Sequence, residues 1–233
     1  MIWQTHPDYA ALSEAAAQIL LEAIGRNPRI VLGLPTGRTP VGMYERVVST
    51  CAREYTCFRD VVTFNLDEYD GIPREHRGSY YTFMRRTLFD ATDIDPRNAH
   101  IPDGMAPDLD AECARYEREI AAAGGLDLTF LGLGSNGHIA FNEPGTPFDS
   151  RTRVVALTES TRAANAPFFP DGNVPAHAIT MGIGTILDSR EIVLLATGES
   201  KRAAIDRLRT GETSTDFPAS ALWTHKNVQV LVA

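Results

Sequence analysis

The chain has 233 residues, 43% of them hydrophobic, which is enough for one good core, so we expect a single domain over residues 1–233. It carries 22 Lys and Arg against 30 Asp and Glu, a net charge of -8, which argues against a broad surface for nucleic acid or for an anionic membrane. Any anionic ligand must therefore be held by a local group of residues.

The first 25 residues, MIWQTHPDYAALSEAAAQILLEAIG, lack a basic leader and carry Glu14 and Glu22 within their apolar pattern. They predict an amphipathic helix and not a signal peptide. No apolar run approaches the roughly 20 residues that span a bilayer. We therefore expect a cytoplasmic protein with no membrane partner.

The three cysteines argue against a zinc site. Cys51, Cys57 and Cys113 show neither CxxC spacing nor a nearby His that would complete a set of ligands. Buried or free thiols in a reducing compartment are the expected state.

Strands and helices alternate along the rest of the chain. Strands are expected at residues 29–35, 61–67, 99–103, 126–134, 152–158, 191–198 and 228–233. Helices are expected at 40–54, 79–90, 109–124 and 201–211, whereas AITMGIGTIL (178–187) fits either state. This alternation predicts an α/β fold with a doubly wound, mostly parallel sheet flanked by helices.

The segment LGLPTGRTP (residues 32–40) looks first of all like a helix start, because Thr39 is a good N-cap and Pro40 suits the first helical position. Gly37 and the N–H groups that follow it also suit a phosphate or another oxyanion. Arg38 is a cation just outside a helix N-terminus and opposes the helix dipole. A bound anion would remove that conflict.

The segment FNLDEYDGIPREHRGSYY (64–81) crowds three carboxylates, Asp67, Glu68 and Asp70, at a strand end. Such crowding raises the pKa of at least one of them and suits it to proton abstraction. Composition alone favours a solvated acidic loop. A metal site is a third alternative, which the neighbouring arginines oppose by competing for the carboxylates.

The segment GSNGHIAFNEPG (134–145) places Asn136, His138 and Glu143 directly after an apolar run. In a parallel α/β sheet, ligands sit at the carboxyl ends of strands. An isolated histidine is usually a hydrogen-bonded structural residue, and tight loops use Asn, Gly and Pro in any case. A carboxylate five positions later shifts the interpretation toward general acid/base chemistry.

A second misplaced cation starts the predicted helix 201–211. Lys201 opposes the dipole of that helix as Arg38 opposes the dipole of its own. Two such cations suggest one shared anion, and a solvated lysine is the alternative.

Taken together, these loops resemble the glucosamine-6-phosphate deaminase family, within the group of sugar-phosphate isomerases and lactonases that share its fold. The resemblance covers nearly the whole chain through LGLPTGRTP, FNLDEYDG, SYYTFM, GSNGHIAFNEPG, SRTRVVALT, STRAAN, AITMGIGTIL and FPASAL. The related 6-phosphogluconolactonases share the Gly-His turn, but the FNEPG continuation favours the deaminase. The resemblance implies conversion of glucosamine 6-phosphate to fructose 6-phosphate and ammonia without cofactor or metal.

The resemblance also implies roles for the catalytic candidates. Asp67 matches the base that moves the C2 proton of the open-chain sugar. His138, oriented by Glu143, matches the residue that opens the pyranose ring. Many members carry Asp where this chain has Asn136, and an amide orients the imidazole without adding a charge.

Two departures concern the phosphate. Pro167 stands where the family has a phosphate-binding arginine, and Arg38 stands where it has a glycine. Lys201 matches the remaining phosphate lysine. We therefore expect Arg38 to replace the lost guanidinium, while Gly37 and Thr39 hold the other phosphate oxygens through the loop N–H groups.

A third departure concerns regulation. Val155 stands where the allosteric members place an effector-binding lysine, and their longer C-terminal tail is absent after Ala233. The resemblance is thus to the short, non-allosteric branch. We expect no activation by an aminosugar phosphate, and a monomer is favoured over a homo-oligomer.

Two alternatives stay open at the level of the sequence. One is another enzyme of the same group, either a lactonase or a deaminase of a different hexosamine phosphate, because the motifs do not reveal the C4 stereochemistry of the sugar. The other is a sugar-phosphate-binding regulator that kept the fold and lost catalysis. Asp67, His138 and Glu143 count against the regulator, whereas Pro167 counts for it.

Overall fold

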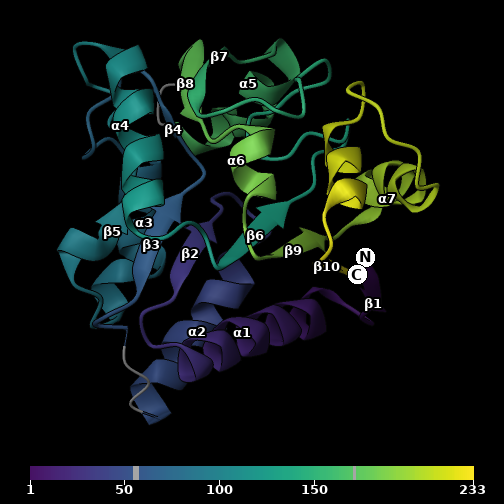
Figure 1. Cartoon of the computed structure of the whole chain (residues 1–233), viewed down its shortest axis with the longest axis horizontal. Helices are drawn as coiled ribbons and strands as arrows, with labels where there is room; N and C mark the ends of the chain where they lie inside the picture. The colour runs from purple at the N-terminus through teal and green to yellow at the C-terminus, as the bar shows by residue number, and fades with distance from the viewer. Residues whose placement is uncertain (55–57, 170–171) are drawn as a thin grey trace.

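The computed structural model of the chain describes residues 1–54, 58–169 and 172–233. Its centre is a seven-stranded sheet with the order β1-β10-β9-β6-β2-β3-β5, in which every neighbouring pair is parallel (Figure 1). The strands are β1 Ile2–Thr5, β2 Val31–Leu34, β3 Val62–Asn65, β5 Ala99–His100, β6 Leu128–Gly132, β9 Glu191–Ala196 and β10 Val228–Val232. The predicted doubly wound, mostly parallel α/β sheet is confirmed.

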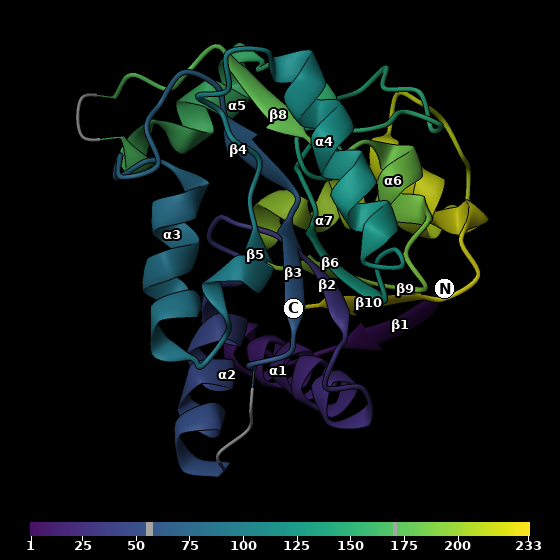
Figure 2. The ribbon, with the colours of Figure 1, turned by 60° about the vertical axis from the view of Figure 1, so that its left-hand side comes forward.

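Helices cover both faces of this sheet (Figures 1 and 2). One face carries α1 (Tyr9–Arg26) and α2 (Val41–Glu54), and the other carries α4 (Leu109–Ala122), α6 (Ile183–Leu187) and α7 (Arg202–Arg209). The remaining helices are α3 (Tyr80–Thr87) and α5 (Glu159–Asn165). Short 3₁₀ turns lie at η1 Phe89–Ala91, η2 Pro96–Asn98, η3 Ala166–Phe168, η4 Glu199–Lys201 and η5 Pro218–Thr224.

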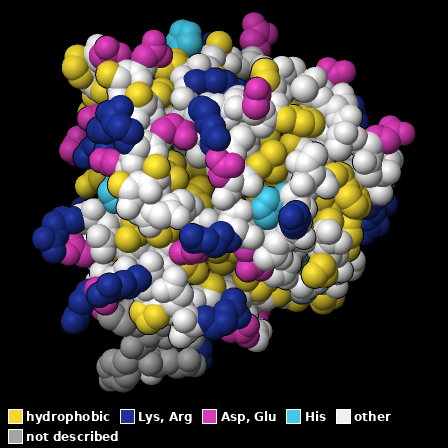
Figure 3. Space-filling view, viewed as in Figure 1, with side chains coloured by type: hydrophobic (Ala, Val, Ile, Leu, Met, Phe, Trp, Pro, Cys, Tyr) yellow, Lys and Arg dark blue, Asp and Glu magenta, His cyan; other side chains and the backbone are white. Residues whose placement is uncertain are grey.

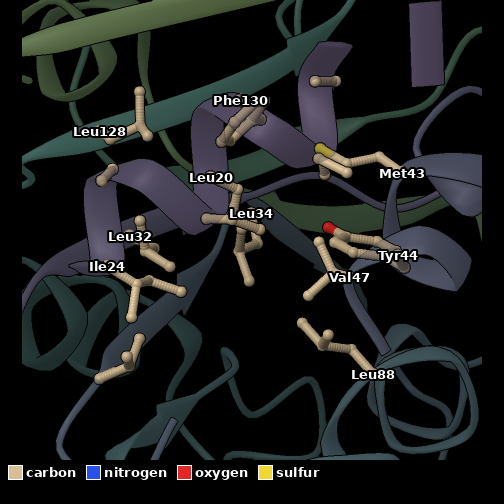
Figure 4. Packing of buried hydrophobic residues seen from close by; sticks show 14 of the residues in the cluster. Leu20, Ile24, Leu32, Leu34, Met43, Tyr44, Val47, Leu88, Leu128 and Phe130 are labelled. Atoms are coloured by element: carbon tan, nitrogen blue, oxygen red, sulfur yellow. The ribbon is translucent and has the colours of Figure 1, made fainter. Parts of the chain in front are cut away.

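The core has two layers because the central strands are buried on both faces. Leu32 and Leu34 of β2 point toward α1 and α2, whereas Val31 packs on the opposite side of the sheet. Figure 4 shows the first layer, in which Leu20 of α1 and Tyr44 of α2 meet the strand residues. Near-continuous apolar strands of this kind are typical of parallel sheets covered by helices.

A second, three-stranded antiparallel sheet was not predicted. It has the order β4-β8-β7, formed by β4 (Asp67–Tyr69), β8 (His177–Thr180) and β7 (Arg153–Ala156). The chain passes from the large sheet to the small one at Leu66, whose N–H donates to Leu34 and whose carbonyl accepts from Met181. The small sheet therefore continues directly from the carboxyl end of β3.

Two sequence predictions need correction, and one ambiguous segment is resolved. The first 25 residues do not form one helix, because Ile2–Thr5 pair with β10 and α1 begins at Tyr9. The side chain of Asp8 accepts a hydrogen bond from the Ala11 N–H, so Pro7 and Asp8 were the overlooked helix-start signal. The expected strand 61–67 divides at Leu66 into β3 and β4, and the ambiguous segment 178–187 contains both a strand and a helix.

The surface charges are mixed, and the two described cysteines are buried. On the face shown in Figure 3, Lys and Arg side chains alternate with Asp and Glu and form no large field of one sign. Cys51 and Cys113 are buried, and Cys57 lies outside the described residues. Among the helices that the structure describes, none is both long enough and apolar enough to cross a membrane.

Candidate active site

Four candidate segments emerge from one edge of the large sheet. Adjacent parallel strands β9, β6, β2 and β3 end there, and each is followed by a segment that carries candidate residues. Lys201 follows β9, His138 follows β6, Arg38 follows β2 and Asp67 follows β3. Because neighbouring strands lie about 4.8 Å apart, the topology gathers these residues at the edge where ligands bind in this class of fold.

The small sheet links two of these segments. Thr180 of β8 lies opposite Asp67 of β4 in the antiparallel register. Its hydroxyl accepts a hydrogen bond of 3.1 Å from the N–H of Phe141, in the loop that carries His138. The amide of Asn142 donates to the carbonyl of Met181 at 2.9 Å, one residue further along the same segment. One element therefore fixes both Asp67 and the His138 loop.

Asp67 is almost completely buried, with 5% of its surface exposed. The pKa of its carboxyl is raised to about 8, mainly by burial and to a smaller extent by the negative charge of Glu68, against the lowering effect of a hydrogen bond from the Thr36 side chain. A carboxyl in this range exchanges its proton near neutral pH, as a general base must. The solvated acidic loop suggested by composition is therefore wrong for Asp67.

Glu68 is equally buried but has a different environment. Its carboxylate accepts hydrogen bonds from the N–H groups of Tyr69 at 2.8 Å, Tyr80 at 2.9 Å and Tyr81 at 2.9 Å. Two of these donors belong to the first turn of α3, where Ser79 is the N-cap. Glu68 thus stabilises the start of a helix, and its oxygens are committed to the backbone.

His138 belongs to a chain of side-chain hydrogen bonds. Its Nδ1 lies 2.7 Å from Oδ1 of Asn136, and Nδ2 of Asn136 donates to Oε2 of Glu143 at 2.7 Å. Oε1 of Glu143 accepts from the hydroxyls of Thr158 and Thr161. The two threonines were not singled out from the sequence, because they lie 15 and 18 residues beyond the glutamate.

This chain of bonds fixes the imidazole tautomer. An ionised Glu143 only accepts hydrogen bonds, so it must face the NH₂ group of Asn136, and the amide oxygen then faces His138. Nδ1 of His138 therefore carries the proton, and Nε2 presents its lone pair. Burial lowers the pKa of His138, the Glu143 carboxylate raises it, and the charge of Lys201 lowers it. The net shift is downward, which favours the neutral base.

Two glycines leave room for this geometry. A Cβ on Gly134 would lie 2.3 Å from Nδ1 of His138, and one on Gly137 would lie 2.1 Å from the Phe217 ring. Gly137 also adopts a φ of 87°, which favours glycine. The glycines seen in the motif therefore serve the close approach of the imidazole and its surroundings.

Among the described residues, the loop after β2 has N–H groups without an acceptor and a cation, Arg38, without an ion pair. Gly37 adopts a φ of 94°, and within the described parts of the chain no acceptor faces the N–H groups of Gly37, Arg38 or Thr39. The Arg38 guanidinium lies 5.3 Å from the centre of the Phe168 ring. The helix itself begins at Val41, with the Pro40 carbonyl accepting from Tyr44, so the predicted cap at Thr39 is one residue early.

Lys201 lies in η4 just before α7 and is partly buried, which lowers the pKa of its ammonium. None of the carboxylates that the structure describes forms an ion pair with it, and the nearby Glu199 pairs with Arg202 instead. Its charge acts on His138. Lys201 is therefore a cation at the same edge as His138 that has no counter-ion among the described residues.

Two further side chains near Asp67 were missed by the sequence analysis. The Thr36 side chain bonds to Asp67 and also to the hydroxyl of Tyr80. The Tyr80 hydroxyl lies 3.2 Å from that of Tyr69. The only signal in the sequence was position, because Thr36 precedes Gly37 and Tyr80 opens the SYY segment.

Among the described residues, the site holds no group with the character of a metal centre. Over residues 1–54, 58–169 and 172–233, the structure contains no group of three or more His, Cys, Asp or Glu side chains that could bind an ion. Arg74 does not pair with Asp67, as it instead lies 3.8 Å from Asp103.

The chain is similar to known proteins both in sequence and in structure. Residues 8–232 match the family described as glucosamine-6-phosphate isomerases/6-phosphogluconolactonase. The chain is 52% identical to the glucosamine-6-phosphate deaminase of Lysinibacillus sphaericus, over 99% of this chain and 98% of that protein. It is 50% identical to the deaminase of Bacillus velezensis, over 96% and 93% of the two chains.

Two solved structures illustrate the range of the likeness. One is a monomeric glucosamine-6-phosphate deaminase with a TM-score of 0.98 and 46% identity, covering 100% of this chain and 97% of that one. The other is the 6-phosphogluconolactonase of Thermotoga maritima, with a TM-score of 0.78 and 22% identity, covering 100% and 99% of the two chains. The second likeness concerns the fold alone.

Proposed function

Since this chain belongs to the family of glucosamine-6-phosphate isomerases and 6-phosphogluconolactonases, we propose that it is a glucosamine-6-phosphate deaminase, which forms fructose 6-phosphate and ammonia. The observation that carries this conclusion is the 52% identity to a deaminase along nearly the full length of both chains. The presence of two distinct proton-transfer groups, Asp67 and His138, at one sheet edge fits a reaction with two separate proton transfers.

His138 opens the sugar ring in this proposal. Its Nε2 takes the proton of the O1 hydroxyl, the C1–O5 bond breaks, and the proton is returned to O5, which leaves the open-chain aldehyde. Asn136 and Glu143 hold the imidazole in the tautomer that this step requires. Because the pKa of His138 is lowered, the ring is neutral and ready to accept the proton at neutral pH.

Asp67 then performs the isomerisation. Its carboxylate takes the proton from C2, a C1–C2 double bond forms, and the aldehyde oxygen is protonated, which gives an enolamine. Return of a proton to C1 gives an imine at C2, and addition of water there releases ammonia and fructose 6-phosphate. A substrate ammonium beside Asp67 lowers the carboxyl pKa of about 8 and favours the charged base.

The phosphate lies, in this proposal, between the loop after β2 and the start of α7. The free N–H groups of Gly37, Arg38 and Thr39 bind its oxygens at the N-terminus of α2. Lys201 supplies one positive charge, and the Arg38 guanidinium supplies the second in place of the arginine lost at Pro167. The contact of Arg38 with Phe168 holds its planar group at the loop.

We also propose that residues 1–233 form one catalytic domain, that the protein works as a monomer, and that it acts in the cytoplasm on a soluble sugar phosphate. The packing of both hydrophobic layers on a single sheet supports the first point. The likeness to a monomeric deaminase supports the second.

The experiment that tests the function measures ammonia and fructose 6-phosphate together after addition of glucosamine 6-phosphate. We expect both products in equal amounts. Galactosamine 6-phosphate, 6-phosphogluconolactone and unphosphorylated glucosamine serve as control substrates. Hydrolysis of the lactone without ammonia release would make the protein a lactonase, and tight binding without turnover would make it a regulator.

The role of Arg38 has its own test. Arg38→Ala removes one charged partner of the phosphate, an interaction worth about 1.5 to 3 kcal/mol, so KM for glucosamine 6-phosphate should rise roughly tenfold to hundredfold. Arg202→Ala is the matched control, because Arg202 pairs with Glu199 on the exposed side of α7. A KM unmoved by Arg38→Ala would remove Arg38 from the phosphate site.

A further inference from the structure

The loop after β2, in which the proposed phosphate site lies, is held by hydrogen bonds to Tyr9, the first residue of α1. The hydroxyl of Tyr9 accepts a hydrogen bond of 2.8 Å from the N–H of Gly42, in the first turn of α2. It also lies 3.1 Å from the carbonyl of Arg38 and 3.0 Å from the carbonyl of Thr39, to which it donates. A single hydroxyl thus contacts both the loop and the helix that follows it.

These contacts set the direction of the loop peptides. In a planar trans peptide the C=O and N–H bonds point in opposite directions. Because the Arg38 carbonyl points to Tyr9, the N–H of Thr39 in the same peptide must point away from α1. The other bond to this carbonyl, from the Val41 N–H, is long at 3.4 Å. Tyr9 is therefore the main restraint on the Thr39 amide.

Tight packing of α1 on α2 fixes the position of the Tyr9 hydroxyl. A Cβ on Gly42 would lie 2.5 Å from the Ser13 hydroxyl oxygen and 3.0 Å from that of Tyr9. Only glycine permits this approach, so the two helices bring the hydroxyl within reach of the loop. The Ser13 hydroxyl is buried at the same contact and has no hydrogen-bond partner among the described residues.

We propose that Tyr9 is a positioning residue for phosphate binding, which aims the Thr39 amide at the substrate through its bonds to the loop carbonyls. The inference rests on the proposed function for the identity of the anion. Tyr9 touches no substrate, and its effect passes through the loop. Loss of its hydroxyl lets the peptide between Arg38 and Thr39 turn, and binding of the phosphate then has to restore its orientation.

The kinetic test compares Tyr9→Phe with Ser13→Ala. Both variants delete one hydroxyl at the same contact between α1 and α2, but only Tyr9 bonds to the loop. Tyr9→Phe should raise KM for glucosamine 6-phosphate roughly two- to tenfold, as expected for one hydrogen bond, with kcat changed by less than about twofold. Ser13→Ala should leave both constants unchanged. Equal effects of the two variants, or an unchanged KM for Tyr9→Phe, would overturn the proposal.

A second measurement uses inorganic phosphate alone and needs no turnover. Phosphate should raise the melting temperature of the wild type, and Tyr9→Phe should need roughly two- to tenfold more phosphate for the same rise. Ser13→Ala should follow the wild type. Identical phosphate titrations of Tyr9→Phe and the wild type, or no response of the wild type, would overturn the role of Tyr9. A wild type that binds phosphate but releases no ammonia would contradict only the proposed function.

Discussion

Asp67 lies in a strand and is nearly inaccessible to water, whereas His138 lies in a glycine-containing loop and keeps 28% of its side chain exposed. Burial is the largest influence on both groups, but it acts in opposite directions: it raises the pKa of the carboxyl and lowers that of the imidazole. In both cases the neutral form gains. Burial in the same protein therefore leaves Asp67 and His138 with pKa values shifted in opposite directions.

The two sites differ in the interactions that oppose the effect of burial on the pKa. Asp67 has one hydroxyl donor, from Thr36, so its charge depends on water and on what binds beside it. His138 is held by a chain of hydrogen bonds through Asn136 to Glu143, which determines the direction as well as the protonation of the ring. We infer that the strand site sets the proton affinity and that the loop site sets the tautomer.

The largest effect is expected at Asp67, where burial is the main cause of the raised carboxyl pKa. Asp67→Asn keeps the shape of the side chain and removes the base, so turnover of glucosamine 6-phosphate should fall roughly 10²- to 10⁴-fold. Glu68→Gln is the matched control, since Glu68 is the adjacent buried carboxylate but bonds to the N-terminus of α3. Glu68→Gln should mainly lower the melting temperature, with a much smaller loss of turnover than Asp67→Asn. A larger loss of turnover in Glu68→Gln than in Asp67→Asn would make Glu68 the base.

His138→Gln should affect the cyclic substrate selectively. If His138 opens the ring as proposed, its loss should slow turnover of the cyclic substrate by about a hundredfold or more. An analogue locked in the open-chain form bypasses that step and should be turned over at nearly the wild-type rate. Equal losses on the two substrates, measured as initial rates of ammonia release, would assign His138 to binding or folding.

Asn136→Asp should have a smaller effect on turnover. The direction in which it moves the pKa of His138 shows whether residue 136 can act on the imidazole through charge as well as through orientation. A carboxylate beside the imidazole raises the pKa of His138 by roughly one unit. More of the ring is then protonated at a given pH, so the neutral base is lost sooner as the pH falls and the acidic limb of kcat/KM moves to higher pH. An NMR titration of the His138 ring measures the shift directly. Asn142→Asp is a poor control because Asn142 is buried, so the wild type serves as the reference. An unchanged titration of the His138 ring in Asn136→Asp would contradict an electrostatic coupling between the two residues.

Six of the seven strands in the large sheet were predictable from apolar runs separated by helices and turns, whereas β1 (Ile2–Thr5) was not. The small sheet was not, since β4 has three residues and pairs with β8 more than a hundred positions later. Nothing in FNLDEY indicates that the chain changes sheets at Leu66. Short strands whose partners are distant in sequence carry little periodic signal, so their pairing appears only in the folded chain.

The candidate site shows the same division. Parallel topology brings Asp67, His138, Arg38 and Lys201 to one edge of the sheet, and the strand-end motifs predict this arrangement from the sequence. The supporting contacts of Thr36 and Tyr9 were out of reach, because a hydroxyl in a loop or at a helix start has no distinctive spacing. Candidate residues at strand ends could therefore be predicted from the sequence. Residues that support them through hydrogen bonds could not.

The claim that burial makes Asp67 a base near neutrality can be tested by a ¹³C NMR titration of aspartate carboxyls in the substrate-free enzyme. The resonance that disappears in Asp67→Asn belongs to this residue. We predict that it titrates with a midpoint near pH 8, neutral below and charged above that value. A midpoint near 4, the ordinary value for aspartate, would contradict the account.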